Sequence, residues 1–437
     1  MHQIRSIPVL LLGMLCMLLL VAGCSSDENT NHALQSDTGN QALTDSAPEN
    51  RATDEPVEAG EPKFETDRGE EDRPASQPEP VELQQQDIEA GMLTAGEWND
   101  LQERNQWLTL LAQDEWRKYE QTWGMYTRQG ITVMVTDSTQ QPLRDVPVIL
   151  SDDSQDWKGR TNQDGTVTLF PFHRLDLQEG TSFSNHPLSI TVGSGRKAVR
   201  LTSQELNGED GMVSVTLDTG HNESTKSNTV DLMLLMDTTG SMSDELSFIS
   251  AELEDVIQRV RQSYEQELHI RTSINVYRDK GDEYVVRSFP FTDSVDQAVQ
   301  LLNMQKADGG GDYEEAVDEA LYEAVYEHEW SEEAAARICF LILDAPPHAT
   351  SETISELQQT VAKASEKGIR IIPVASSGVN QMTEFWLRSL AQITGGTYVF
   401  LTDHSGIGHS HLPASVGEYE VEFLNDLMVR LITEYVH

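Results

Sequence analysis

The C-terminal half of the chain alternates between continuous apolar runs and amphipathic segments. Three runs are apolar almost throughout, which is typical of strands covered on both faces: "VDLMLLMD" (230–237), "RICFLILD" (337–344) and "IRIIPVAS" (369–376). In residues 243–262 apolar positions recur every three or four residues, which predicts a helix with one buried face. The alternation predicts a doubly wound α/β domain with a mostly parallel, Rossmann-like sheet over residues 228–437.

The same periodicities predict the remaining elements of this domain. Further strands are expected at 269–279, at 397–403 and, as an edge strand, at 284–291. Further helices are expected at 294–304, 312–330, 353–368, 382–396 and 418–436.

Residues 128–220 have a different pattern, with short alternating strands separated by polar turns. The turn signals include "DSTQQP" and "QDG". This pattern predicts a small antiparallel β-sandwich. The stretch "PLRDVPV" followed by "TNQDGTV" resembles carboxypeptidase-regulatory-like and immunoglobulin-like modules of surface proteins, although Gln141 stands where the usual turn glycine would be. That resemblance implies a spacer or presentation role.

Residues 91–127 contain four tryptophans among helix-forming residues. The segment predicts one or two short helices. An aromatic row on a helix is more often a packing face than a ligand site, so we expect it to dock on a neighbouring domain. The tryptophans are Trp98, Trp107, Trp116 and Trp123.

Charge separates the N-terminal region from the rest and excludes one class of partner. Residues 24–90 are rich in Asp, Glu, Ser, Thr and Pro, with almost nothing to bury, which predicts a disordered acidic stalk. The 437-residue chain has 30 Lys and Arg against 73 Asp and Glu, a formal charge of -43. Nucleic-acid binding rests on basic residues that neutralise phosphates, so it is not expected.

Residues 1–23 have the features of an export signal: a basic residue, an apolar run and small residues before a cysteine. The end of this segment, Val21-Ala22-Gly23-Cys24, resembles the lipobox of bacterial lipoproteins. The resemblance implies cleavage before Cys24 and attachment of lipid to it. The protein would then be held outside the cytoplasm, on the cell membrane or the outer membrane at the bacterial cell surface. An uncleaved anchor is the alternative. Cys339 then has no disulfide partner and is expected in the core.

The stretch "LLMDTTGSMSDEL" (234–246) brings a carboxylate and several hydroxyls to the end of a predicted buried strand. Asp344 ends another such strand. Ligands of open α/β sheets gather at the carboxyl ends of the strands, so we expect these groups to form a site.

Three classes of enzyme site are excluded by the residues of this stretch. The sequence contains neither a P-loop nor a G-x-S-x-G nucleophile elbow. A phosphatase of the haloacid-dehalogenase type would need a second carboxylate two residues after Asp237, where Thr239 stands. We therefore expect no enzymatic activity.

The pattern Asp237-Thr-Thr239-Gly-Ser241 fits the D-x-[ST]-x-S signature of the metal-ion-dependent adhesion site. With Asp344 after a later strand and "GGGD" at 309–312 between them, residues 228–437 resemble a von Willebrand factor type A (VWA) domain. The resemblance implies a divalent cation, Mg²⁺ with Ca²⁺ or Mn²⁺ as alternatives. It also implies a protein partner that offers an acidic residue to that cation.

The donor set agrees with this interpretation. Hard cations take oxygen ligands and retain water molecules. The hydroxyls of Thr239 and Ser241 are neutral, so the cation keeps charge with which to bind a partner's carboxylate.

The segment "GGGD" departs from the adhesion pattern, because integrin-type members have a threonine there. Asp312 is the candidate for the missing ligand. Alternatively, it caps the helix that follows and never meets metal. A third carboxylate would weaken the cation's attraction for a partner.

Two other polar clusters lie near the predicted sheet edge. Arg278, Asp279 and Asp282 either flank the site or form a solvated turn. The histidines of "DHSGIGHSH" (403–411) are compatible with zinc, but a loop at the rim of the sheet is the favoured interpretation.

The sequence therefore predicts a lipid-anchored surface protein that binds a protein partner through a divalent cation. The alternative is an envelope lipoprotein whose α/β domain serves as a scaffold without metal-dependent binding.

Overall fold

The structure is a computed structural model that describes residues 88–173, 188–194, 198–202, 212–218, 228–264 and 268–436. All of them belong to one compact unit, Glu82–His437. The predicted signal segment with Cys24, and nearly all of the predicted acidic stalk, lie outside the described residues.

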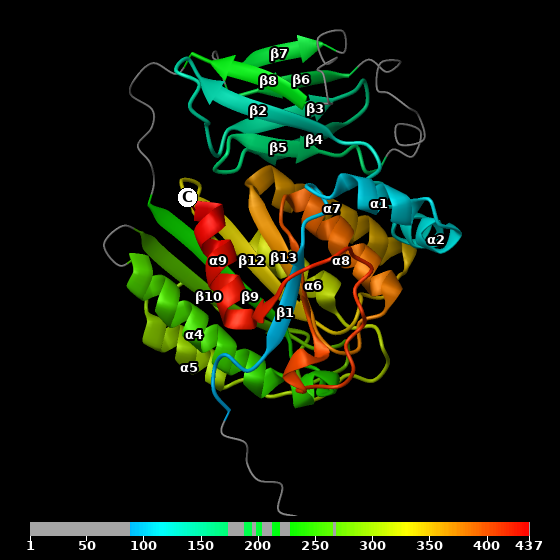
Figure 1. Cartoon of the computed structure of the whole chain (residues 1–437), viewed down its shortest axis with the longest axis vertical. Helices are drawn as coiled ribbons and strands as arrows, with labels where there is room; N and C mark the ends of the chain where they lie inside the picture. Colours follow the sequence, from blue (N-terminus) through cyan, green and yellow to red (C-terminus); the bar gives the residue numbers. More distant parts are fainter. Residues whose placement is uncertain are drawn as a thin grey trace, which may run out of the picture. The chain divides into compact units, whose positions relative to one another are not determined.

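An eight-stranded sheet forms the centre of the C-terminal domain, in the order β11-β10-β9-β12-β13-β14-β1-β15 (Figure 1). Its five middle strands are parallel: β10 (His269–Tyr277), β9 (Thr229–Asp237), β12 (Ala336–Leu343), β13 (Ile369–Ala375) and β14 (Tyr398–Leu401). The other three pair antiparallel: β11 (Val286–Ser288), β1 (Thr94–Trp98) and β15 (Val421–Phe423). The domain thus has a mixed α/β sheet.

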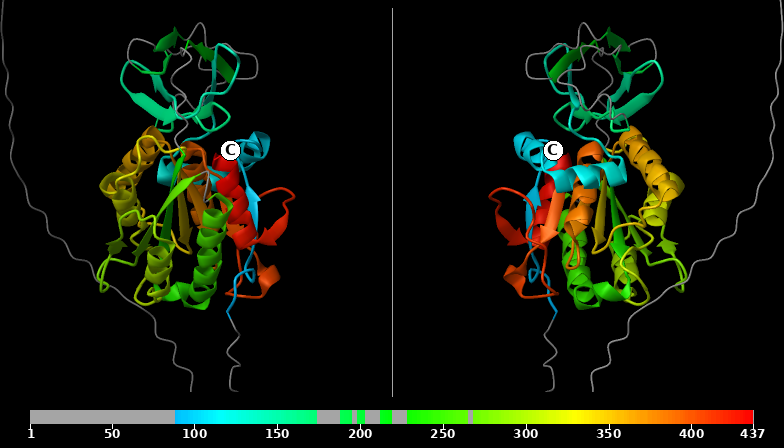
Figure 2. Two further views of the ribbon diagram at one scale, coloured as in Figure 1. Left: turned by 90° about the vertical axis from the view of Figure 1, so that its left-hand side faces the viewer. Right: turned by 90° about the vertical axis from the view of Figure 1, so that its right-hand side faces the viewer.

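Helices cover both faces of this sheet (Figure 2). On one face α4 (Leu246–Tyr264), α5 (Val295–Asn303) and α9 (Leu424–Val436) share a buried cluster with the sheet. On the other face the second cluster includes α6 (Val317–Tyr322), α7 (Ser351–Lys367) and α8 (Gln381–Thr394).

The central strand β9 contributes to both of these clusters. Its residues Leu232 and Leu234 belong to the first cluster, whereas Met233 and Leu235 belong to the second. Successive side chains of a strand point to opposite faces, so a strand covered on both sides must be apolar at every position. The prediction made from the continuous apolar runs is confirmed.

The N-terminal boundary of this sheet differs from the prediction. Residues 91–127 were expected to be helical, but Thr94–Trp98 forms β1, which pairs with both β14 and β15. The short β15 also precedes the closing helix, which begins at Leu424. Strands this short carry little periodicity of their own, and they form here because each offers the other a backbone partner.

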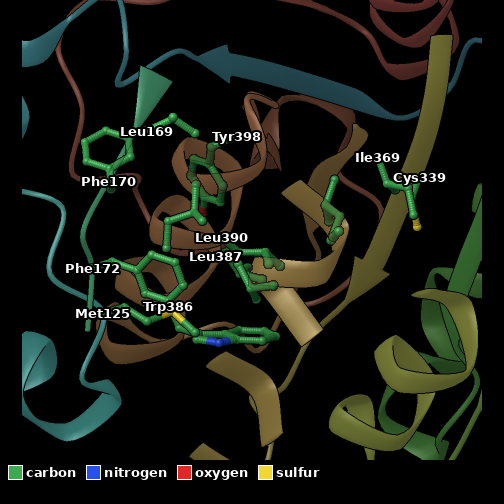
Figure 3. Packing of buried hydrophobic residues seen from close by; sticks show 14 of the residues in the cluster. Met125, Leu169, Phe170, Phe172, Cys339, Ile369, Trp386, Leu387, Leu390 and Tyr398 are labelled. Atoms are coloured by element: carbon green, nitrogen blue, oxygen red, sulfur yellow. The ribbon is translucent and has the colours of Figure 1, made fainter. Parts of the chain in front are cut away.

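The two expected helices follow β1 as α1 (Arg104–Leu111) and α2 (Asp114–Trp123). Their tryptophans dock on α8: Trp107 stacks on Phe385 with ring centroids 5.6 Å apart, and Trp123 lies 5.7 Å from Trp386. The prediction that the aromatic row is a packing face is confirmed. Figure 3 shows Trp386 among the buried residues of this cluster, which also holds the unpaired, buried Cys339.

Residues 131–217 form two smaller sheets, β5-β2-β8 and β4-β3-β6-β7. Their bounds are β2 (Ile131–Asp137), β3 (Pro147–Ser151), β4 (Asp156–Arg160), β5 (Thr166–Leu169), β6 (Ser189–Val192), β7 (Val199–Thr202) and β8 (Met212–Leu217). The predicted antiparallel pairing is confirmed for β2 with β5, for β3 with β4 and β6, and for β6 with β7, whereas β8 pairs parallel to β2. No hairpin turn joins β8 to β2, so no turn dictates an antiparallel direction.

Across the described residues, no helix has the length and apolar character that crossing a membrane requires.

A buried ion cluster holds the N-terminal segment against α8. The guanidinium of Arg388, which is fully buried, donates to Asp100 at 2.6 and 2.8 Å and to Glu384 at 3.0 Å. It also lies 4.9 Å from the ring of Trp107. Loss of one partner from a buried ion pair leaves a charge without compensation.

We expect Asp100→Ala to lower the free energy of unfolding by about 3 kcal/mol, because Arg388 would lose its bidentate partner. Asp114→Ala is the matched control, since the exposed Asp114–Arg117 pair should contribute little. Urea denaturation of both variants tests this expectation. Equal losses in the two variants would contradict it.

Candidate metal centre

The first two candidate ligands lie at the carboxyl ends of neighbouring parallel strands. Asp237 is the last residue of β9, and Asp344 directly follows β12. The loop before α6 reaches the same edge, where Asp308 N donates to Thr238 O at 3.1 Å and Gly240 N donates to Gly309 O at 3.2 Å. Three loops distant in sequence therefore meet beside β9.

The hydroxyls of the motif join these carboxylates in one network. Asp237 Oδ1 accepts from the backbone N of Thr239 at 2.8 Å and from its Oγ1 at 2.7 Å. Thr239 Oγ1 lies 3.1 Å from Ser241 Oγ, and the nearby Ser241 hydroxyl acts to lower the pKa of Asp344. The structure thus brings together Asp237, Thr239, Ser241 and Asp344. Their role as ligands stays a prediction.

The two carboxylates are buried without compensation of their charge. Burial, and next the charge of Asp344, raise the pKa of Asp237 to about 7. Burial also raises the pKa of Asp344 to about 6, although the hydrogen bond from Ser241 opposes this. Among the described residues, Asp237 Oδ2 and Asp344 Oδ1 have no hydrogen-bond partner. Buried polar atoms without partners are uncommon in folded proteins, and water or a bound ion is a usual explanation for them.

A third buried carboxylate, Glu315, belongs to this cluster and was missed in the sequence. Its side chain is 2% exposed and Oε2 has no partner in the described part of the chain. Burial, followed by the charges of Asp237 and Asp279, raises its pKa to about 9. The segment "DYEE" offers three acidic residues, and nothing in its pattern marks which of them points inward.

Gly310 makes the approach of this loop to the cluster possible. A Cβ atom at Gly310 would lie 2.9 Å from Glu315 Oε1 and 3.4 Å from Thr239 Cβ, and the residue has φ +73°. Both the crowding and the left-handed backbone require glycine here. One of the three consecutive glycines thus has a direct role in assembling the site.

Asp312 occupies a different place from the one expected. It is exposed, and its carboxylate groups with Asp279 and His348. The alternative that it caps a helix is wrong, because α6 begins at Val317 and its N-cap is Ala316. Within the described residues no hydrogen bond joins Asp312 to Asp237, and its assignment as a ligand of the first cation stays a prediction.

The loop histidines do not form a zinc cluster in the described part of the chain. His411 lies between Asp403, 2.8 Å from Nδ1, and Glu245, 2.9 Å from Nε2, whereas His409 pairs with Asp244. His409 and His411 therefore have carboxylate partners of their own. The favoured interpretation, a loop at the rim of the sheet, agrees with this arrangement.

Comparison with known proteins identifies the domain. Residues 231–409 match the model of the von Willebrand factor type A domain family. Among solved structures, the conserved hypothetical protein BatB from Bacteroides thetaiotaomicron is similar, with 14% identity over 47% of this chain and 98% of that chain and a TM-score of 0.33. No match was found among curated proteins. The chain thus contains a VWA domain, and β1, β15 and α9 lie outside the matched residues.

Glu315 gives the cluster a pH dependence whose sign can be tested. Its pKa is about 9 in the folded protein against an ordinary 4.5, so between these values the folded state binds more protons than the unfolded state. Stability without metal must then fall as pH rises through this window. In chelator at pH 8 we expect Glu315→Gln to stabilise the protein by on the order of 1 kcal/mol.

The matched control is Glu314→Gln, which changes the preceding, more exposed carboxyl. Thermal unfolding at pH 5 and pH 8 gives the change in stability between these two pH values. This change should be smaller for Glu315→Gln than for the wild type or for Glu314→Gln. If Glu315→Gln instead destabilised the protein at pH 8, the negative charge of Glu315 would have to be compensated in the folded state, and the prediction would be wrong.

Proposed function

We propose that this protein is a lipid-anchored, cell-surface binding protein that engages a protein partner through a divalent cation in its VWA domain. The observation that carries the proposal is the set of buried carboxylate oxygens of Asp237, Asp344 and Glu315 that have no partners among the described residues. A dication is the simplest group that compensates several such charges at once.

The residues present fit a hard cation. Asp237, Thr239, Ser241 and Asp344 would hold it through oxygen atoms, directly or through water. All four side chains offer oxygen and none offers nitrogen or sulfur, so Mg²⁺ is the expected ion, with Ca²⁺ or Mn²⁺ as alternatives. When bound, the cation supplies an exchangeable position for a carboxylate of the partner.

Glu315 sets an upper limit on the strength of this interaction. Two neutral hydroxyls leave a dication with an attraction for a further carboxylate. A third negative group beside Asp237 and Asp344 reduces that attraction. We therefore expect weaker, reversible binding of an acidic partner residue, rather than the tight binding that the adhesion pattern implies.

The competing function is a scaffold that assembles proteins without metal-dependent binding. One observation favours it: Asp237 Oδ1 already accepts two hydrogen bonds from Thr239, so part of the loop is ordered by its own contacts. The two functions differ in their response to magnesium and to loss of the Asp237 charge. We expect no enzymatic activity for either.

The proposed membrane attachment rests on Val21-Ala22-Gly23-Cys24. When the chain is expressed in a bacterium with labelled fatty acid, we expect label on the wild-type protein and on Cys16→Ser, since Cys16 lies in the segment that is removed. Cys24→Ser should carry none, because its side chain has no thiol to acylate. Label that persists on Cys24→Ser would contradict lipid attachment at this residue.

Asp237→Asn tests the cation site through its effect on stability in chelator and on stabilisation by magnesium. In chelator the variant should be at least as stable as the wild type, because it removes an uncompensated buried charge. Magnesium at 100 times its dissociation constant should stabilise the wild type by about 2.7 kcal/mol and leave the variant unchanged. Thermal unfolding with magnesium and with chelator measures both effects.

The exposed Asp293→Asn is the control for charge alone and should respond to magnesium like the wild type. The same three proteins, used as bait for cell-surface extracts, test the function. The partner should be retained by the wild type and the control in magnesium only. Retention that neither chelator nor Asp237→Asn reduces would favour the scaffold.

A further inference from the structure

A second group of possible metal ligands lies beside the first centre. It comprises Asp279 from the loop after β10, Asp312 from the loop before α6 and His348 from the loop after β12. One ligand atom from each residue lies within 4.8 Å of the other two. His348 Nε2 is 3.4 Å from Asp279 Oδ1, which is too long for a strong hydrogen bond.

The three loops are held together by contacts other than those of the cluster itself. Asp282 Oδ2 accepts from Gly310 N at 2.8 Å and from Asp279 N at 3.1 Å, and Glu315 N donates to Pro346 O at 3.0 Å. A Cβ at Gly309, whose φ is +80°, would meet the carboxylate of Asp282 at 2.4 Å. The positions of Asp279, Asp312 and His348 are therefore set in advance by the backbone.

Neighbouring basic side chains do not neutralise this cluster. Arg278, next to Asp279, donates to Lys306 O at 2.8 Å and lies 4.6 Å from the ring of Tyr284. Lys280, on the other side, lies 3.6 Å from Asp318 and 3.5 Å from Glu319. Both cations flanking Asp279 are thus directed to other groups.

The buried carboxylate of Glu315, which supports the first centre, is also subject to the charges of the second group. Its carboxylate is buried, its Oε2 has no partner in the described part of the chain, and the charges that act on it include Asp279 and Asp282 as well as Asp237. The second group therefore adjoins the first centre, and its member Asp279 is itself only 8% exposed.

We propose that Asp279, Asp312 and His348 form a second cation site that takes a transition-metal dication such as Zn²⁺. An imidazole nitrogen with two carboxylates suits zinc, whereas Mg²⁺ prefers oxygen donors only. Three protein ligands leave a coordination position for water or for a donor from a partner. Asp312 is exposed and His348 half-buried, so this position faces solvent.

The test is calorimetric titration of Zn²⁺ into the full chain with magnesium in excess, so that the first centre is not in competition. We expect one Zn²⁺ per chain, and affinity at least 10-fold weaker for His348→Ala, since even changes to groups behind the ligands cost 10- to 100-fold. Asp312→Asn removes an exposed ligand without risk to folding and should weaken Zn²⁺ binding similarly.

Two controls separate this site from other zinc-binding groups. His409→Ala removes an exposed histidine that pairs with a single carboxylate, and it should bind Zn²⁺ like the wild type. Asp237→Asn should lose the response to magnesium and keep Zn²⁺ binding, so that failure of either site is seen separately. Wild-type affinity in both His348→Ala and Asp312→Asn, or no Zn²⁺ binding by the wild type, overturns the proposal.

Discussion

The register of β9 between β10 and β12 determines where the charged groups of the domain lie. Parallel pairing places Asp237 beside Tyr277 and Met236 beside Ile342. The three strands therefore end together, and the loops that follow them carry Asp237, Asp279 and Asp344 to one edge. A shift of one residue would move every side chain of β9 to the opposite face and separate these carboxylates.

The same strand contains a second buried carboxylate, whose charge is compensated by neighbouring groups. Asp231, near the start of β9, is as buried as Asp237, but it accepts two hydrogen bonds of 2.7 Å from Arg271 and one of 2.6 Å from Ser331 N. Its charge is satisfied by the protein. In the described part of the chain, Asp237 Oδ2 has no such partner. The two carboxylates are equally buried, so they differ in their hydrogen-bond partners and not in their burial. The contrast within one strand agrees with the cation site proposed at its carboxyl-terminal end.

Most of the fold follows from patterns that are local in sequence. The apolar runs of β9, β12 and β13 and the amphipathic helices are long enough to show their periods, and the motif around Asp237 is continuous. The strands β1 and β15 could not be predicted, because β1 pairs with β15 and with β14 across hundreds of residues. The parallel direction of β8 likewise depends on a partner distant in sequence.

The residues of the site, too, could be predicted only where a local sequence pattern encodes them. Asp237, Thr239 and Ser241 lie in one turn, and Asp344 ends a recognisable strand. The third segment was misjudged because the direction of each side chain in "GGGDYEE" depends on Gly310 and on the bond from Glu315 N to Pro346 O. Those contacts turn Glu315 inward and leave Asp312 at the surface, which no period in the segment encodes.

The separation of Asp312 from Glu315 gives the edge of the sheet two donor sets of different chemistry. Around Asp237 and Asp344 every donor is oxygen, whereas at Asp279 an imidazole joins two carboxylates. Glu315 is subject to the charges of both sets, so a dication at either one lowers the repulsion that the other carboxylates exert on it. A lysine in place of a cation would neutralise only one charge and would leave no exchangeable position. In a chain with a net charge of -43, retaining uncompensated carboxylates at one edge is consistent with a surface that meets its partner through metal.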